Sequence, residues 1–179
     1  MKIIAISTLC FALLTAGCGP DNVHQLKQQL NTVAGTADAA VKLNHNNYTS
    51  GIYGPVGSDK AVATRVKVAT ILNDVLVPIS VAVEVSKGVT AANFTGSKAQ
   101  IISLIQTAAA KASQQSTGNK EIDVALQAIA AALNTALTVI QAFTSAEIRN
   151  VARPGQLLTE QAVQLGNVLK SNQEVCACL

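Results

Sequence analysis

Apolar residues recur three and four positions apart over much of the chain beyond its first twenty residues. In the stretch 21–45 they form a heptad-like seam on an otherwise polar surface: Val23, Leu26, Leu30, Val33, Ala37 and Ala40. This spacing places all six on one face of an α-helix. Because the last two are small alanines, the seam predicts packing within a helical bundle rather than a long coiled coil.

The stretch 59–87 predicts a second helix, in which seven apolar residues share one face at helical spacing. Val77, Val81 and Val85 lie off that face, and a helix that is apolar on most sides is typically buried. Pro78 is expected to kink this helix, because its ring displaces the carbonyl group four residues earlier.

A β-strand is the alternative for residues 79–86. Apolar, mostly β-branched residues alternate strictly with other residues there, as in a half-buried strand. The sequence offers no obvious partner strand, and a lone strand leaves its backbone hydrogen-bonding groups unsatisfied. We therefore favour the helix.

Three further amphipathic stretches predict helices near 97–114, 119–149 and 155–171. Ser97 and Gln100 have the spacing of a capping box and are expected to begin the first of these. Glycine, proline, asparagine and serine mark the connections, and the connection at 46–58 contains both tyrosines, Tyr48 and Tyr53. The sequence thus predicts an all-α, up-down bundle of about five helices that forms one domain over 18–179.

Residues 122–143 are apolar enough to resemble a membrane span. However, their polar residues fall on one side at helical spacing: Asp123, Gln127, Asn134, Thr138 and Gln141. Such a segment is amphipathic, which favours a helix of the bundle core over a membrane span.

Composition agrees with closely packed helices and excludes some functions. Hydrophobic residues make up 49% of the chain but aromatic residues only 3%, so the core is expected to consist of small aliphatic side chains. The net charge is +3, and the basic residues are scattered without forming a run. A nucleic-acid-binding surface normally shows a basic stripe with aromatic residues, so we expect no nucleic-acid partner.

Candidate catalytic groups are sparse in the sequence. The two histidines, His24 and His45, are 21 residues apart, which corresponds to about 30 Å along a straight helix. They cannot share a metal ion within one chain, and each is expected to be a surface residue. The acidic residues are dispersed, and the sequence contains no nucleophile or phosphate-loop motif. We expect no enzymatic activity, no cofactor and no metal site.

The first 17 residues have the features of a secretory signal. Lys2 is followed by an apolar run from Ile3 to Leu14 and then by small residues. The apolar run of about 12 residues is too short to cross a bilayer core of ~30 Å comfortably. Residues 1–17 are therefore expected to be removed during secretion, together with Cys10.

Leu14-Thr15-Ala16-Gly17-Cys18 resembles the lipobox of bacterial lipoproteins. The resemblance covers only the first 18 residues, and it implies that Cys18 is lipidated and becomes the first residue of the mature protein. Several acyl chains on one residue give stable membrane anchoring, where a single chain binds only marginally. By analogy with lipoprotein sorting, Gly19 (rather than aspartate) after Cys18 implies the outer membrane. The alternative is an ordinary secretory signal in which Cys18 is incidental.

Cys176 and Cys178 are expected to lie in a short tail that follows the last helix. In an oxidising envelope they are candidates for disulfides, above all with another chain. Two thiols without a third ligand make a weak metal site. The end of the chain also has the form of a prenylation site, but prenylation contradicts a secretion signal.

Three functions are compatible with these features. The first is a non-catalytic, lipid-anchored envelope protein that contacts another, unidentified envelope protein or the cell wall. The second is a carrier of small apolar ligands between alanine- and valine-rich helices. The third is a membrane-active or exclusion lipoprotein that works through 122–143. We favour the first.

Overall fold

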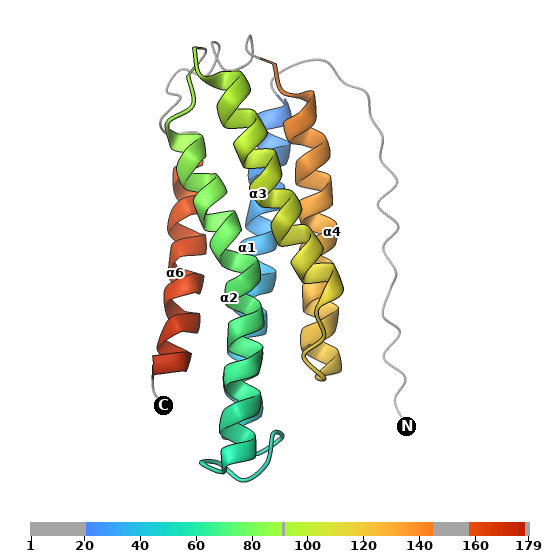
Figure 1. The fold of residues 1–179 in the computed structure, drawn as a ribbon, viewed down its shortest axis with the longest axis vertical. Coiled ribbons are helices and arrows are strands. Elements are labelled where there is room, and N and C mark those ends of the chain that lie inside the picture. The colour runs from blue at the N-terminus through green and yellow to red at the C-terminus, as the bar shows by residue number, and fades with distance from the viewer. Residues whose placement is uncertain (1–20, 91, 145–157, 178–179) are drawn as a thin grey trace.

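The computed structural model describes residues 21–90, 92–144 and 158–177 (Figure 1). Within these ranges the regular elements are α-helices, with no strand: α1 (Asp21–Thr49), α2 (Asp59–Lys87), α3 (Phe94–Gln114), α4 (Lys120–Ala142) and α6 (Thr159–Ala177). The five helices pack against one another, which confirms the prediction of an all-α bundle.

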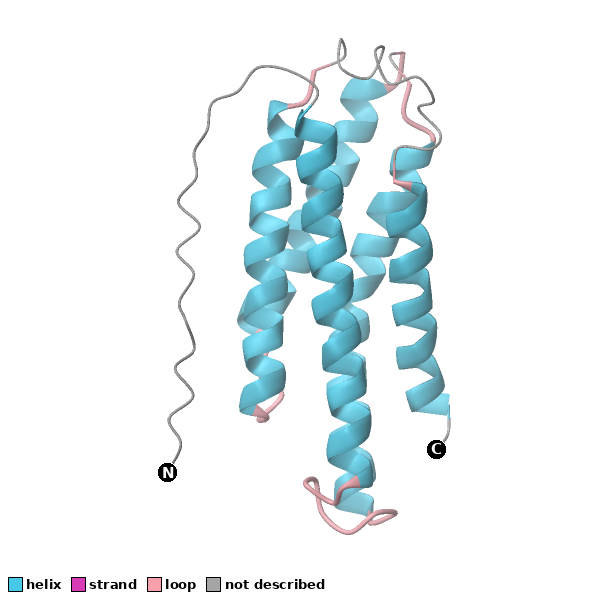
Figure 2. Cartoon of the chain, turned by 180° about the vertical axis from the view of Figure 1, so that it is seen from behind, coloured by secondary structure: helices cyan, strands magenta, loops and turns pink. Residues whose placement is uncertain are grey.

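Successive helices run in opposite directions along a common axis, giving an up-down arrangement (Figures 1 and 2). The helix α1 packs against α4, α2 and α6, while α3 packs between α2 and α4, and α2 also contacts α6. The helices thus close into a ring around one core. We call the end where α1 begins and α2 ends the upper end, and the end where α1 joins α2 the lower end. The α1–α2 hairpin extends beyond the other helices at the lower end.

The core is built from the apolar seams that the sequence predicts. Five of the six seam residues of α1 are buried, with Val33 and Ala37 fully so, and Val23 packs against the core while partly exposed. Alanines also contribute, since Ala108 and Ala136 have no exposed surface. Such small side chains allow neighbouring helix backbones to approach closely, and this explains how a chain with so few aromatic residues fills its interior.

The helix α2 begins and ends where the sequence predicts. The side chain of Ser58 accepts a hydrogen bond from the backbone N–H of Ala61 and caps its start. The helix continues through Pro78, so the alternative strand at 79–86 is wrong. Burial on most sides is also wrong, because Val77 and Val81 are each 43% exposed.

Two helices begin or end differently from the prediction. The helix α1 continues to Thr49 rather than to 45, because Asn44 and Asn47 turn inward and the Asn44 side chain bonds across the hairpin. Tyr48 therefore lies on a helix and not in a loop. The helix α3 begins at Phe94, so Ser97 falls in its first turn and does not cap it. Asn93 precedes the helix without a capping side-chain hydrogen bond, and its side chain accepts a hydrogen bond from the backbone N–H of Thr90 in the preceding loop, at 2.7 Å.

The last two helices also differ in extent. The helix α4 ends at Ala142, earlier than the predicted 149, and residues 145–149 lie outside the described ranges. Lys98 donates hydrogen bonds to the carbonyl group of Gln141 in the last turn of α4 and to that of Phe143, which follows the helix. The helix α6 begins at Thr159 and ends at Ala177, later than the predicted 155 and 171. Its extension includes Asn172, which is fully buried and bonds to α2.

Within the part of the chain that the structure describes, two helices are long and apolar enough to span a membrane, α2 and α4, and both contribute to the core. In α4 the residues Ile122, Leu126 and Leu133 have no exposed surface. The polar residues that the sequence places opposite them include Gln127 and Asn134, and these are exposed. The prediction that 122–143 supplies an amphipathic core helix is confirmed for 122–142, with Phe143 following the helix.

The turn between α3 and α4 is held by the carboxylate of Asp123. The backbone N–H and the hydroxyl group of Thr117 each donate to its Oδ1 at 2.7 Å, and the hydroxyl group of Ser116 donates to Oδ2 at 2.8 Å. Burial by itself would raise the pKa of Asp123, but the hydrogen bonds from Thr117 and Ser116 outweigh it and lower the pKa. All these bonds favour the charged form.

We expect acid to weaken this turn. Because the folded-state pKa of Asp123 lies below its unfolded value of 3.8, its contribution to stability is present above that value and is lost as the pH falls through the folded pKa. Asp123→Asn should therefore lower the free energy of unfolding at pH 7 and reduce its loss below about pH 4. Urea unfolding over a pH series measures both effects. Glu121→Gln, which removes an exposed carboxyl group from the same helical turn, is the control, and equal acid sensitivity of wild type and Asp123→Asn would refute the assignment.

Candidate functional site

The predicted lipidation site, Cys18, lies outside the described residues, but covalent geometry limits its position. Asp21, the first residue of α1, follows three residues later. Three residues span at most roughly 11 Å. A lipid on Cys18 would therefore be attached beside the upper end of the bundle.

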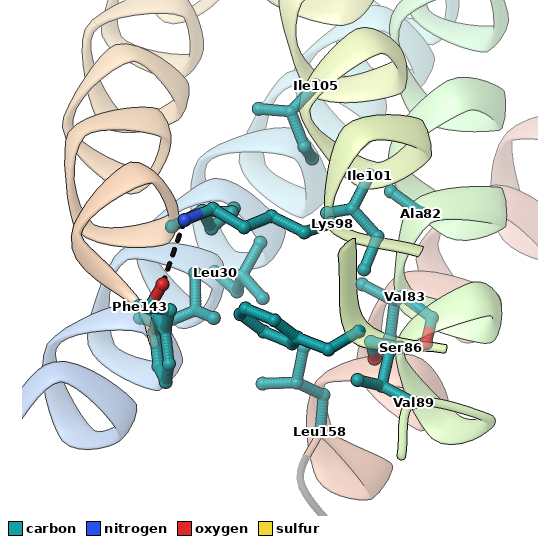
Figure 3. Close-up of a pocket in the computed structure, with 13 residues that line it drawn as sticks. Leu30, Ala82, Val83, Ser86, Val89, Lys98, Ile101, Ile105, Phe143 and Leu158 are labelled. Atoms are coloured by element: carbon teal, nitrogen blue, oxygen red, sulfur yellow. Dashed lines mark hydrogen bonds between the residues drawn. The ribbon is translucent and has the colours of Figure 1, made fainter. Parts of the chain in front are cut away.

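The upper end also contains a small apolar cavity, to which all five helices or their flanking residues contribute (Figure 3). Its volume is about 50 Å³, and its lining includes Leu30, Val83, Phe94, Ile105 and Leu158. Pockets for drug-sized ligands have volumes of about 300–1,000 Å³. The volume of this cavity lies well below that range, so it gives no support to a carrier function.

Among the described residues that line this cavity, Lys98 is the only charged one, and its charge is engaged by the protein. The Nζ atom donates to the carbonyl groups of Gln141 at 2.7 Å and Phe143 at 2.8 Å (Figure 3). It also lies 5.6 Å from the centre of the Phe94 ring. A cation at the C-terminal end of a helix stabilises its unpaired carbonyl groups. Lys98 therefore holds the end of α4 and is not poised for a ligand.

At the lower end, a buried polar network joins α1 to α2. The hydroxyl group of Tyr53 donates to Asn44 Oδ1 at 3.1 Å, and Asn44 Nδ2 donates to the carbonyl group of Arg65 at 3.1 Å. Burial raises the pKa of Tyr53, and the nearby Asn47 side chain only partly offsets this, so the phenol remains neutral and can donate. The network fixes the geometry of the hairpin.

The turn of the hairpin, 50–58, exposes two large apolar side chains. Ile52 is 66% exposed and Val56 is 59% exposed. Gly51 and Gly57 adopt positive φ angles of 78° and 83°, which allow the chain to turn sharply on either side of them. We call this turn the tip. The sequence predicts it as a loop, but not that it projects from the bundle with apolar side chains outermost.

A polar cleft lies beside the hairpin, between α1, α2 and α6, and has a volume of about 490 Å³. Its lining comes from three helices: Val41, Lys42, His45, Asn46, Arg65, Ser171 and Glu174. Of these, His45 is exposed, as expected, whereas Arg65 is only 7% exposed. The sequence pattern gave no sign of this cleft, since Arg65 is one of several scattered basic residues and the last helix was expected to end at Ser171.

The remaining candidate residues are the two histidines and the two C-terminal cysteines. His24 and His45 lie on the same helix, α1, as expected. Cys176 falls within α6 rather than in a tail, and Cys178 lies outside the described residues. The disulfides expected of these two thiols therefore remain a prediction. Within the described ranges, no three side chains of histidine, cysteine, aspartate or glutamate are close enough to hold a metal ion.

Comparisons of the chain with family models, curated proteins and solved structures found no match. A functional assignment must therefore come from the residues and geometry of the chain itself.

Proposed function

We propose that this chain is a non-catalytic, lipid-anchored protein of the bacterial cell envelope that acts through contacts with another protein or with the cell wall. The observation that carries the proposal is the short distance between the lipobox cysteine and the fold. Only Gly19 and Pro20 separate Cys18 from α1, so the anchor and the upper end of the bundle belong together. Gly19 supports the outer membrane as the destination.

This placement leaves the tip free for contacts. The 29 residues of α1 correspond to a length of about 44 Å, and the tip lies at the far end of that helix. Ile52 and Val56 are therefore exposed at the opposite end of the molecule from the anchor. Exposed apolar side chains that project together are typical of surfaces that meet a partner.

The two alternative functions receive less support. A carrier of apolar ligands needs a pocket, but the apolar cavity has a volume of only about 50 Å³. A membrane-active helix needs a free apolar face, but the apolar face of α4 is buried in the core. Either function would require the bundle to open.

A matched pair of cross-linking positions tests the proposal. Val56 at the tip and Val163 on α6 have nearly equal exposure, 59% and 58%, but Val163 lies near the upper end. With a photo-reactive amino acid at each position in turn, irradiation of intact cells should give one discrete adduct from position 56 and little from position 163. Ile52→Asp should reduce the yield at position 56, because it places a charge in the apolar contact.

Equal adduct patterns from both positions, or none from position 56, would contradict a contact at the tip. Subcellular fractions of the same cells report separately on the envelope location. The two parts of the proposal can therefore fail independently.

A further inference from the structure

We propose that the polar cleft between α1, α2 and α6 binds a small ligand through a carboxylate or phosphate group, with Arg65 as its principal contact. This assigns a binding site to the side of the bundle and does not depend on the lipid anchor. The cleft volume of about 490 Å³ lies within the range of about 300–1,000 Å³ that is common for small-molecule sites.

Arg65 is a buried basic residue at the base of the cleft. Only 7% of the residue is exposed, and its Nε atom has no hydrogen-bond partner. Among the described residues, no ion pair reaches its guanidinium group, and Glu174 across the cleft pairs with Lys170 instead, at 3.9 Å. Buried charged groups are normally paired or hydrogen-bonded, so an unpaired guanidinium group that lines a cleft is suited to binding an anion.

The orientation of Arg65 is fixed by its neighbours on α1. Its Cζ atom lies 4.5 Å from the centre of the Tyr48 ring, and its own carbonyl group accepts the hydrogen bond from Asn44. Stacking on an aromatic ring holds the planar guanidinium group and leaves its edge free for hydrogen bonds. That edge presents N–H donors in a rigid fork that matches two oxygens of a carboxylate or phosphate group.

The exposed rim of the cleft supplies further groups that can contact an anion. Lys42, His45 and Ser171 surround the cleft and supply a cation, an imidazole ring and a hydroxyl donor. Lys42 is also paired with Asp38 at 2.6 Å, and Glu174 contributes one negative charge. The rim is exposed, and its side chains can rearrange around a ligand, whereas Arg65 is held in place. The site therefore selects for an oxyanion at its base and tolerates varied groups toward the solvent.

The test is a titration of the purified full chain with inorganic phosphate and, separately, with citrate. In a nitrogen–proton NMR spectrum, the Nε–H signal of Arg65 should shift saturably, and its absence from the Arg65→Lys variant assigns it. Arg65→Met should weaken binding at least tenfold, measured by calorimetry. Lys67→Met, which removes one charge from an exposed position of the same helix, should change the affinity less than twofold.

Because Arg65 also packs on Tyr48, the Arg65→Met variant changes buried contacts as well as the charge. A second variant therefore leaves the buried residues untouched. Ser171→Glu adds a carboxylate to the exposed rim and should weaken binding several-fold without altering the helical circular dichroism signal. Saturable binding of either anion that both variants weaken supports the proposal. The anion that binds more tightly, phosphate or citrate, identifies the preferred group. Unchanged affinity in both the Arg65→Met and Ser171→Glu variants, or no saturable response to either anion, overturns it.

Discussion

Replacing Cys18 with alanine should abolish the incorporation of labelled palmitate into the protein in bacterial cells. The lipobox resemblance implies that the sulfur of Cys18 forms a thioether bond to a diacylglyceryl group, which carries the acyl chains, and alanine offers no sulfur atom for that bond. Stable anchoring needs more than one acyl chain, so loss of this residue removes the whole attachment and not a part of it. The expected effect is complete loss of label.

Cys10→Ala is the matched control for this experiment. It removes a thiol from the apolar run of the same signal but leaves Leu14 to Cys18 intact, so labelling should remain at the wild-type level. Label that persists in Cys18→Ala would place the acyl group elsewhere in the chain. Equal loss in both variants would indicate a general defect in secretion.

The second large effect is expected at the centre of α4. Leu133 has no exposed surface and contributes to the core of the bundle. Leu133→Ala should lower the free energy of unfolding by about 2–5 kcal/mol, because it removes buried methyl groups and leaves a cavity that the neighbouring helices fill only in part. Urea unfolding followed by far-ultraviolet circular dichroism is the suitable measurement for a chain without tryptophan.

Val124 on the same helix provides the control, since it is 69% exposed. Val124→Ala should change the free energy of unfolding by less than about 0.5 kcal/mol. This pair of variants also tests whether α4 is a core helix in the folded protein. A Leu133→Ala variant as stable as the wild type would mean that the apolar face of α4 is not packed, and it would revive the membrane-active alternative.

The periodicity of apolar residues predicted a helix accurately where a strong start signal and a strong stop signal enclose one apolar seam. The helix α2 has such limits, with Ser58 as its cap and Gly88 after its last residue, and its bounds were predicted without error. The alternation at 79–86 left a strand as the alternative, and the burial pattern shows why the favoured helix was correct. Ile79, Ala82, Val83 and Ser86 are buried at helical spacing, while Val81 remains exposed.

Helix ends were mispredicted where contacts between distant segments outweigh local preference. Asparagine has a modest helix propensity, yet Asn44 and Asn172 are fully buried within helices because their side chains bond to α2. Their partners are 21 and 103 residues away in the chain, measured to Arg65 and Ala69. No local pattern in the sequence encodes such a partner.

The same reason explains why the cleft was missed. Its base is Arg65, whose burial depends on Tyr48 lying on an extended α1 and on α6 continuing beyond Ser171. Both extensions were outside the predicted helices. By contrast, the lipobox is a local motif, and the sequence alone was sufficient to propose it.

The most direct test of the account is the intact mass of the protein extracted from bacterial membranes. We predict the mass of residues 18–179 plus acyl chains, with the acyl mass located on the N-terminal peptide that begins at Cys18. A product that retains Met1, or one cut at another position without acyl chains, would contradict both the anchor and the orientation of the bundle that follows from it.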